Sequence, residues 1–340
     1  MRILVCLVGA QGDAVARALT LGRRLRERGH ELAFLGEFIP AVETEIARIG
    51  AVLVRQATAE HYDVALMASL GGPDRLGALA RKLPSLLLVQ ECMPEVMSLK
   101  GDFVHWVTLF RNARAAVFMS EYQRDKVFGS FISGVDPSRL LVLPCGPEAS
   151  ALEPRQLKPK DYFNIVATGA VASHRRFQDV IAAGERLRDF NLQFTFVGDA
   201  RAMSLLPEGT RKVIQRHPGR YVFTGAKSPA ETLALIRQAD LFCHAMIEDA
   251  WPQSVWDAAA SGLPLMLSDV EAYSRDWTNG INCLKFPVNR PDFMASLVRL
   301  MLQDDVLRNS LAAAAQATAR KYPVERFTSQ VVQMLESLKR

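Results

Sequence analysis

Apolar runs of strand length alternate with helical patterns along almost the whole chain, and this alternation limits the possible folds more than any other feature. The first 55 residues contain five such segments, "RILVCLVG", "AVARALTLGRRLRERG", "HELAFLGE", "AVETEIARIG" and "AVLVR". Parallel strands joined by crossover helices produce this order, and strands buried on both faces are apolar throughout. We therefore predict an α/β protein built from doubly wound parallel sheets.

The alternation stops near residue 150, where the stretch "PCGPEASALEPRQLKPKDY" has four prolines and no apolar periodicity. Such a stretch is typical of a linker. The alternation restarts at "FNIVATGA", and 340 residues suffice for two domains with separate cores. We predict two Rossmann-like domains, 1–150 and 151–322, that face each other across a cleft. A helix follows in 323–340, with its apolar residues on one face, and we expect it to pack back on the N-terminal domain.

Composition places the chain among ordinary globular proteins, with 49% hydrophobic and 23% charged residues. The net charge of +5 is spread thinly, because residues 1–150 carry 17 basic and 16 acidic side chains and residues 151–340 carry 24 and 20. Neither half is a polycation, so we expect no nucleic-acid partner. The densest basic cluster, "LGRRLRERGH", lies on the polar face of a predicted helix, which leaves open a solvated face or attachment to a membrane surface.

Five cysteines are widely spaced and form no C-x-x-C pair, namely Cys6, Cys92, Cys145, Cys243 and Cys283. This pattern argues against a disulfide framework or a structural zinc site. The apolar N-terminal run lacks a long hydrophobic region and a cleavage site, and no window holds eighteen uncharged apolar residues. We expect a cytoplasmic protein, and the inner face of the membrane stays open as its location.

The loops at the carboxyl ends of the strands are the candidate ligand sites, because open α/β sheets bind ligands there. In "LVGAQGDAVARAL", Gly9 and Gly12 bracket the first turn from strand to helix. Glycine lets a ligand approach the backbone, but the G-x-G-x-x-G fingerprint of dinucleotide sites is absent, which disfavours NAD. We predict Gly12 as a ligand contact. Asp13 either caps the helix or faces the cleft as a substrate contact or base.

A second candidate loop is "ATGAVASHRRFQDVI", in which the strand ends at Thr168 and Gly169. Arg175 and Arg176 begin the next helix, and the fork of an arginine can hold two phosphate oxygens. We predict Gly169 and Arg175 at a diphosphate site and interpret Arg176 as a surface residue.

The third candidate is "EDAWPQSVWDAAASGLP", where a polar loop gives way to an apolar helix. Pro252 stands where the first helical residue would be, a position at which its missing N–H costs nothing. We expect a phosphate site at the backbone N–H groups of the helix N-terminus, those of Gln253, Ser254 and Val255.

Two acids flank this helix start. Asp257 lies within reach of a ligand bound there and could accept from the two hydroxyls of a ribose, while Asp249 would approach from the other end of the ligand. The alternative is structural, with Asp249 as a helix cap and Asp257 as a solvated helix residue.

The same stretch resembles the E-x7-E hallmark of the GT-B-fold retaining glycosyltransferases of family GT4, the group-1 glycosyltransferases. That hallmark is commonly E-G-F-P-x-x-x-x-E-A-x-A-x-G-x-P-V, and "DAWPQSVWDAAASGLPL" follows it position by position. Other segments are similar in the same order: "VATGAVASHRRFQDVI" to G-R-L-x-x-x-K-G, "FVGD" to V-G-x-G, and "FTGAKSPAETLALIRQADLFCHAM" to F-x-G…L-x-x-A-D-x-x-x-x-P-S. The resemblance spans nearly the whole chain and implies a GT-B architecture.

This resemblance also implies an activity, the transfer of a sugar from a nucleoside-diphosphate sugar, with a UDP-sugar favoured, to an acceptor hydroxyl. It implies retention of the anomeric configuration, no metal or other cofactor, and a place in glycan, polysaccharide or glycoconjugate biosynthesis. Asp257 would then hold the ribose, Asp249 would contact the donor sugar, and Arg175 would stabilise the leaving diphosphate. Deprotonation of the acceptor would fall to the leaving phosphate, to Asp13 or to Glu91.

The sequence departs from the family pattern at several of these positions. Both motif glutamates are aspartates, whose carboxylates reach about 1.5 Å less far, and the second cation of the diphosphate site is replaced by Ala170. A first-domain histidine of the family falls where this sequence has Gln90 and Glu91.

Two alternatives therefore stay open. One is a catalytically weakened GT-B protein that serves as binding partner or scaffold for another glycosyltransferase, and the other is a GT-B sugar-nucleotide epimerase. The acceptor is equally open among a lipid-linked glycan, a polysaccharide, a protein and a small molecule.

Overall fold

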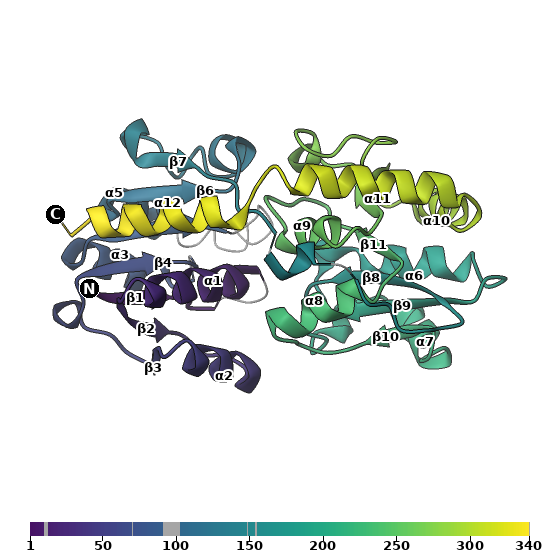
Figure 1. Cartoon of the computed structure of the whole chain (residues 1–340), viewed down its shortest axis with the longest axis horizontal. Helices are drawn as coiled ribbons and strands as arrows, with labels where there is room; N and C mark the ends of the chain where they lie inside the picture. Colours follow the sequence, from purple (N-terminus) through teal and green to yellow (C-terminus); the bar gives the residue numbers. More distant parts are fainter. Residues whose placement is uncertain (10–12, 70, 91–102, 148, 154, 340) are drawn as a thin grey trace. The chain divides into compact units, whose positions relative to one another are not determined.

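The structure is a computed structural model, and it describes residues 1–9, 13–69, 71–90, 103–147, 149–153 and 155–339. The chain divides into two compact units (Figure 1). Unit 1 consists of Met1–Cys145 together with Val324–Arg340, and unit 2 consists of Gly146–Pro323. Unit 1 is therefore assembled from two separated stretches of the sequence.

The sheet of unit 1 is parallel throughout, with the strand order β3-β2-β1-β4-β5-β6-β7. Its strands are β1 (Arg2–Cys6), β2 (Glu31–Leu35), β3 (Val52–Val54), β4 (Val64–Met67), β5 (Ser85–Val89), β6 (Ala115–Phe118) and β7 (Leu140–Val142). The helices of its first stretch are α1 (Asp13–Glu27), α2 (Pro40–Arg48), α3 (Pro73–Lys82) and α5 (Phe103–Asn112). The order reverses between β1 and β4, and right-handed crossovers then place helices on both faces of the sheet.

Helix α12 (Val324–Ser337) completes unit 1, where it contacts α1, β4 and β5 (Figure 1). Its buried residues recur at helical spacing and are Val324, Phe327, Thr328, Val331, Val332 and Leu335. Near its end, Glu336 accepts hydrogen bonds from Arg28 at 3.0 Å and from His30 Nε2 at 3.0 Å. The C-terminal helix thus packs on the unit that contains the N-terminus.

The Glu336 carboxylate makes the stability of unit 1 depend on pH. Burial alone would raise its pKa, but the hydrogen bond from His30 and the charges of Arg28 and His30 hold the pKa below its usual value. A depressed carboxyl pKa adds stability above the pKa of the unfolded chain, and that stability is lost as the pH falls through the folded-state pKa.

We therefore expect Glu336→Gln to lower the unfolding free energy of unit 1 by about 1 kcal/mol or less at pH 7. The deficit should shrink as the pH falls from about 5 toward 2, because the wild-type carboxylate is then protonated in both states. Urea titrations of both proteins across this range measure the difference. A deficit that stays constant with pH would contradict the assignment.

The sheet of unit 2 is also parallel, with the order β10-β9-β8-β11-β12-β13. Its strands are β8 (Phe163–Thr168), β9 (Leu192–Val197), β10 (Tyr221–Phe223), β11 (Leu241–His244), β12 (Leu265–Ser268) and β13 (Leu284–Phe286). Its helices are α6 (Phe177–Glu185), α7 (Glu208–Arg216), α8 (Pro229–Arg237), α9 (Gln253–Ala260), α10 (Pro291–Gln303) and α11 (Asp305–Ala319). The order reverses between β8 and β11. The prediction of two doubly wound parallel-sheet domains is confirmed.

Each unit buries its own apolar core. The core of unit 1 includes Leu4, Met67, Trp106, Phe110 and Phe118, all at most 1% exposed. The core of unit 2 gathers side chains from β8, β9, β11 and helices α6 and α10, among them Ile165, Phe194, Phe196, Cys243 and Val298. Strands that are apolar on both faces fill these cores, as the continuous apolar runs in the sequence indicate.

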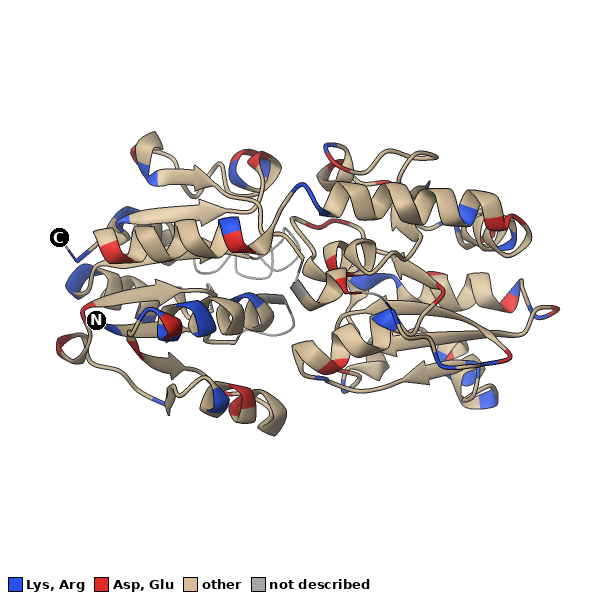
Figure 2. Ribbon diagram, in the orientation of Figure 1, with Lys and Arg blue, Asp and Glu red and all other residues tan. Residues whose placement is uncertain are grey.

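Basic and acidic side chains are interspersed along both units, as Figure 2 shows. The basic cluster of α1 follows this pattern, since Arg23 pairs with Glu45 at 3.4 Å and Arg24 pairs with Glu27 at 2.8 Å. Among the helices that the structure describes, none is long and apolar enough to cross a membrane.

The four described cysteines are buried and form no disulfide with one another, namely Cys6, Cys145, Cys243 and Cys283. Burial raises the pKa of the Cys6 and Cys243 thiols to about 12. These side chains are therefore neutral parts of the packed interior and are poor nucleophiles.

Candidate functional site

Two loops meet where the strand order of unit 2 reverses, between β8 and β11. β8 ends at Thr168 and β11 ends at His244, and the two strands are direct neighbours. The loop after β8 carries Gly169 and Arg175, while the loop after β11 carries Asp249 and leads into α9. Such a reversal is where open α/β sheets bind their ligands, so the structure brings these predicted site residues together.

Helix α9 is buried along its whole length. The Thr168 hydroxyl donates to the Ser254 hydroxyl at 2.8 Å, which ties the end of β8 to the first turn of the helix. Trp251 and Trp256 stack with their ring centroids 4.4 Å apart, and Tyr322 packs edge-on against both. The two tryptophans of the motif therefore fix the entry of the chain into α9.

Two details of the predicted helix N-terminus are wrong. Pro252 is the capping residue, not the first helical one, because its ψ of 114° keeps it extended and the helix begins at Gln253. The N–H of Val255 is not available to a ligand, since it donates to the Pro252 carbonyl at 3.2 Å. Gln253 and Ser254 then remain as the predicted residues of the first turn, at the positive end of the helix dipole.

Arg175 is held over Gly169. It ends a short 3₁₀ turn (Ser173–Arg175), and a Cβ placed on Gly169 would come within 2.4 Å of its guanidinium carbon. Gly169 also has φ +119°, a conformation that other residues rarely adopt, so glycine is required there on two grounds. The pair provides a cation fixed at the carboxyl end of β8.

Arg176 has a different role from its neighbour. Its guanidinium forms a two-point ion pair with Asp179 at 2.9 and 3.1 Å, at the start of α6. The interpretation of Arg176 as a surface residue holds only in part, because its side chain is engaged with Asp179 and is about a quarter exposed.

Asp257 is 7% exposed, so the alternative of a solvated helix residue is wrong. The side-chain amide of Gln253, one turn earlier on α9, donates to Asp257 Oδ1 at 3.0 Å and to the Gly146 carbonyl at 2.9 Å. Gln253 thus orients the carboxylate and joins it to the start of unit 2.

Asp249 is also 7% exposed, and it is no helix cap, because α9 has no side-chain cap. Its Oδ1 accepts from the Ala250 N–H at 2.7 Å, and its Oδ2 accepts from His244 Nε2 at 2.8 Å and from the Tyr273 hydroxyl at 3.2 Å. His244 and Tyr273 are not among the residues predicted from the sequence. A histidine at the end of a strand beside the reversal was a usable signal for the first, whereas Tyr273 follows a different strand and carries no local signal.

Burial alone would raise the pKa of Asp249. The hydrogen bond and charge of His244, the charge of Arg175 and the Ala250 N–H outweigh it and hold this pKa below its usual value. Asp249 is therefore an ionised carboxylate in a buried position, within electrostatic range of Arg175.

Three of the predicted residues belong to unit 1, namely Gly12, Asp13 and Glu91. Gly12 and Glu91 lie outside the described residues. Asp13 is the first residue of α1, and its side chain also lies outside the description. Gln90 stands at the position of the family histidine. Its side-chain amide accepts from the buried Arg17 of α1 at 2.9 Å and donates to the Ala68 carbonyl after β4 at 2.5 Å, so it links these two elements.

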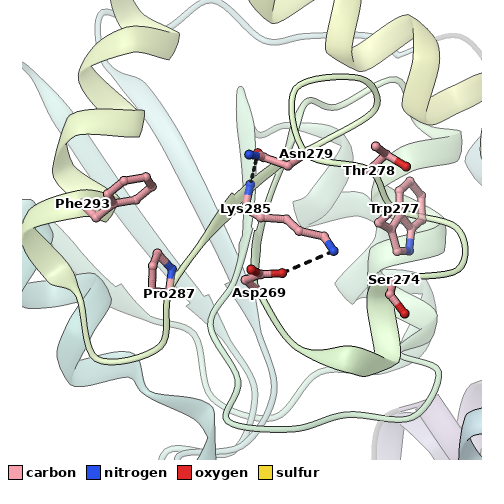
Figure 3. A pocket seen from close by; sticks show the side chains of 8 residues that line it. All are labelled: Asp269, Ser274, Trp277, Thr278, Asn279, Lys285, Pro287 and Phe293. Atoms are coloured by element: carbon pink, nitrogen blue, oxygen red, sulfur yellow. Dashed lines mark hydrogen bonds and ion pairs between the residues drawn. The ribbon is translucent and has the colours of Figure 1, made fainter.

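A hollow of about 370 Å³ lies in unit 2 beside β12 and β13 (Figure 3). Lys285 extends across it toward Asp269, with 3.5 Å between Nζ and Oδ1, and Phe293 lies at its opposite side. None of the predicted site residues lines this hollow. We therefore place the candidate site at the reversal between β8 and β11 and not in the hollow.

Comparison with known proteins identifies the domain that contains this site. Residues 162–304 match the family described as "Glycosyl transferases group 1". This match covers 143 of the 340 residues, so the likeness to the group 1 glycosyltransferases is one of unit 2. The matched stretch includes Gly169, Arg175, Asp249 and Asp257, and so covers the whole of the site in unit 2.

Phosphatidyl-myo-inositol mannosyltransferases are similar in sequence to part of this chain. The protein of Mycobacterium tuberculosis is 25% identical over 166 residues, which cover 41% of this chain and 44% of the relative. The protein of Mycobacterium leprae is 27% identical over 117 residues, covering 34% of this chain and 31% of the relative. The match thus spans less than half the length of these curated relatives.

Solved structures resemble the whole chain. HepE of Anabaena, in complex with UDP and glucose, superposes with a TM-score of 0.83 at 16% identity, covering 99% of this chain and all of that one. WaaG, a glycosyltransferase involved in lipopolysaccharide biosynthesis, gives a TM-score of 0.70 at 15% identity, with 98% and 99% covered. Likeness at these identities is one of fold, and it confirms the predicted GT-B fold.

Proposed function

We propose that the chain transfers a hexosyl group from a nucleoside-diphosphate sugar, preferably a UDP-sugar, to an acceptor hydroxyl. One observation carries the proposal: the reversal between β8 and β11 brings a fixed cation, a helix N-terminus and two buried carboxylates to one end of unit 2. Arg175 supplies the cation, and Asp249 and Asp257 supply the carboxylates. A nucleoside-diphosphate sugar has a ribose, a diphosphate and a sugar that match these three kinds of group.

Each group has a part in the proposed reaction. Asp257 accepts from the ribose hydroxyls, because a carboxylate accepts two adjacent O–H donors. Arg175 and the positive end of α9 meet the charge that develops on the leaving diphosphate, which is where fixed cations and dipoles lower a barrier most. Asp249 contacts the donor sugar.

The finer features of the reaction are also part of the proposal. Transfer retains the anomeric configuration and needs no metal, since Arg175 and the helix N-terminus act on the diphosphate in place of a metal ion. The acceptor hydroxyl is deprotonated by the leaving phosphate, by Asp13 or by Glu91. A glycolipid or growing glycan is the favoured acceptor, given that the similar mannosyltransferases are named for phosphatidyl-myo-inositol and WaaG for lipopolysaccharide biosynthesis. The protein then works in the cytoplasm, at the inner face of the membrane when its acceptor is a lipid.

Isothermal titration with UDP, GDP and ADP, in buffer with EDTA, tests the proposal. We expect one nucleotide, UDP first, to bind at micromolar concentration, and the matching nucleotide sugar to be consumed when acceptors are added. Failure of all three nucleotides to bind, with and without magnesium, would overturn the proposed function. Binding only with magnesium would overturn metal independence alone.

A second candidate function is that of a catalytically weakened partner or scaffold of another glycosyltransferase. The aspartates in place of the two motif glutamates favour this candidate, because both carboxylate oxygens of Asp249 already accept hydrogen bonds from within unit 2. Asp257→Glu and Asp249→Glu separate the two candidates. An increase in turnover on restoring either glutamate would support a weakened enzyme, whereas a loss would show that the site is adapted to the shorter side chains.

A further inference from the structure

The buried carboxylate of Asp249 is held by three donors from three different places in unit 2. His244 comes from the end of β11, Tyr273 from the 3₁₀ turn Glu271–Tyr273 after β12, and Ala250 from the adjoining backbone. His244 and Tyr273 are each 2% exposed. An ionised carboxylate can only accept, so the His244 nitrogen at 2.8 Å must carry its proton and donate.

This arrangement leaves little freedom to the carboxylate. A carboxylate has about four lone-pair positions. Two donors, His244 and Tyr273, occupy Oδ2, and one donor, the Ala250 N–H, occupies Oδ1. Among the contacts of the described residues, the remaining accepting position of Asp249 is therefore on Oδ1.

The charges around Asp249 stabilise its ionised form, as the hydrogen bonds to it do. Removing a buried partner of a carboxylate leaves it with an uncompensated charge or forces it to take up a proton. Arg175, the cation of the proposed diphosphate site, also acts on Asp249 through its charge. The carboxylate that His244 and Tyr273 hold is thus electrostatically coupled to the place where the donor would bind.

We propose that His244 and Tyr273 are positioning residues, which hold the Asp249 carboxylate so that Oδ1 accepts from one hydroxyl of the donor sugar. This inference rests on the proposed function. A glutamate at this position would have one more rotatable bond, and each bond that must be fixed on binding lowers affinity. The shorter Asp249, whose Oδ2 accepts from His244 and Tyr273, presents Oδ1 in a single orientation.

A single fixed acceptor also has a consequence for the substrate. A buried site that hydrogen-bonds one hydroxyl discriminates strongly against an analogue that lacks it, because the buried oxygen is then left unpaired. The donor sugar is accordingly one with this hydroxyl free, and the corresponding deoxy sugar is rejected.

The test compares His244→Leu, His244→Gln and Tyr273→Phe with the wild type, using UDP and UDP-glucose as probes. We expect His244→Leu to bind UDP within about 2-fold of wild type, and its kcat/KM for UDP-glucose to fall about 10- to 100-fold, the effect of losing a hydrogen bond to a charged group. Tyr273→Phe should lower kcat/KM for UDP-glucose about 3- to 10-fold, since the hydrogen bond that it removes is longer than that of His244. Glutamine carries an N–H near the position of the imidazole Nε2, so His244→Gln should recover most of the activity.

The pH profile provides a readout that a merely structural role would not move. Without His244, the pKa of Asp249 rises, since the largest influences that lower it are gone. The acidic limb of kcat/KM should therefore shift to higher pH in His244→Leu and return toward the wild-type position in His244→Gln.

Two matched control variants exist elsewhere in the chain. His30→Leu removes another buried histidine that pairs with a carboxylate, at 3.0 Å from Glu336, and Tyr221→Phe removes a buried hydroxyl that donates to Glu185 at 2.8 Å. Both should lower stability but leave the ratio of UDP to UDP-glucose affinity unchanged. The positioning role is overturned if His244→Leu keeps wild-type kcat/KM, or if it loses UDP and UDP-glucose binding equally. Failure of the wild type to bind any nucleotide would instead overturn the proposed function itself.

Discussion

Asp257→Ala is expected to weaken the binding of UDP by about 100-fold or more, with the protein still folded. Hydrogen bonds to a charged group contribute about 1.5–3 kcal/mol each, and two ribose hydroxyls would lose their shared acceptor. Every 1.4 kcal/mol corresponds to about a factor of ten in the dissociation constant. Asp257→Asn, which keeps the shape but removes the charge, should lose less. Titration calorimetry with UDP measures both effects.

Asp240 offers a matched control for Asp257. It is an acid at the opposite, amino end of the unit 2 sheet, where it accepts from the Asn164 N–H at 2.7 Å and pairs with Lys160 at 2.6 Å. Asp240→Asn should lower the unfolding midpoint and leave UDP affinity unchanged. Unchanged UDP affinity in Asp257→Ala would contradict the assignment of Asp257 to the ribose.

Arg175→Ala is expected to lower kcat about 100- to 1,000-fold, the range found when one fixed donor to a developing negative charge is removed. The effect on KM should be smaller, because the charge on the leaving diphosphate grows mainly in the transition state. Arg175→Lys should retain part of the activity, since the resembling family has lysine there. Initial-rate kinetics with the preferred nucleotide sugar separate kcat from KM.

The neighbouring Arg176 is the control for this experiment, because its guanidinium is engaged with Asp179. Arg176→Ala should keep kcat within about 3-fold of wild type while losing some stability. Gly169→Ala should reproduce the loss seen in Arg175→Ala, since the added Cβ would occupy the place of the guanidinium. Equal kcat losses in Arg175→Ala and Arg176→Ala would contradict a specific role for Arg175.

The fold was readable from the sequence because buried parallel strands are recognisable one at a time. Runs such as "RILVCLVG" and "FNIVATGA" became β1 and β8, and the proline-rich break falls where unit 2 begins. Helix ends were less certain, as Pro252 shows, because a proline suits the residue before a helix as well as its first turn.

The candidate site was readable only in part. Gly169, Arg175, Asp249 and Asp257 lie on loops that a sheet reversal must bring together, and their order along the chain resembles a known motif. The surroundings of Asp249 could not be predicted, because Tyr273 is 24 residues away and reaches it from the loop after another strand. Val255 was misjudged for a related reason, since its N–H turns back to the Pro252 carbonyl, a local bond that sequence spacing does not reveal.

Unit 2 interrupts unit 1 along the chain, and this order matters during synthesis. Residues 1–145 leave the ribosome first, but the α12 helix that covers α1, β4 and β5 emerges only after all of unit 2. Unit 2 is a single stretch of sequence, so it can fold before α12 is made, while the apolar surface of unit 1 that α12 covers is still exposed. The apolar surface that α12 covers on α1, β4 and β5 is therefore formed before the helix that buries it.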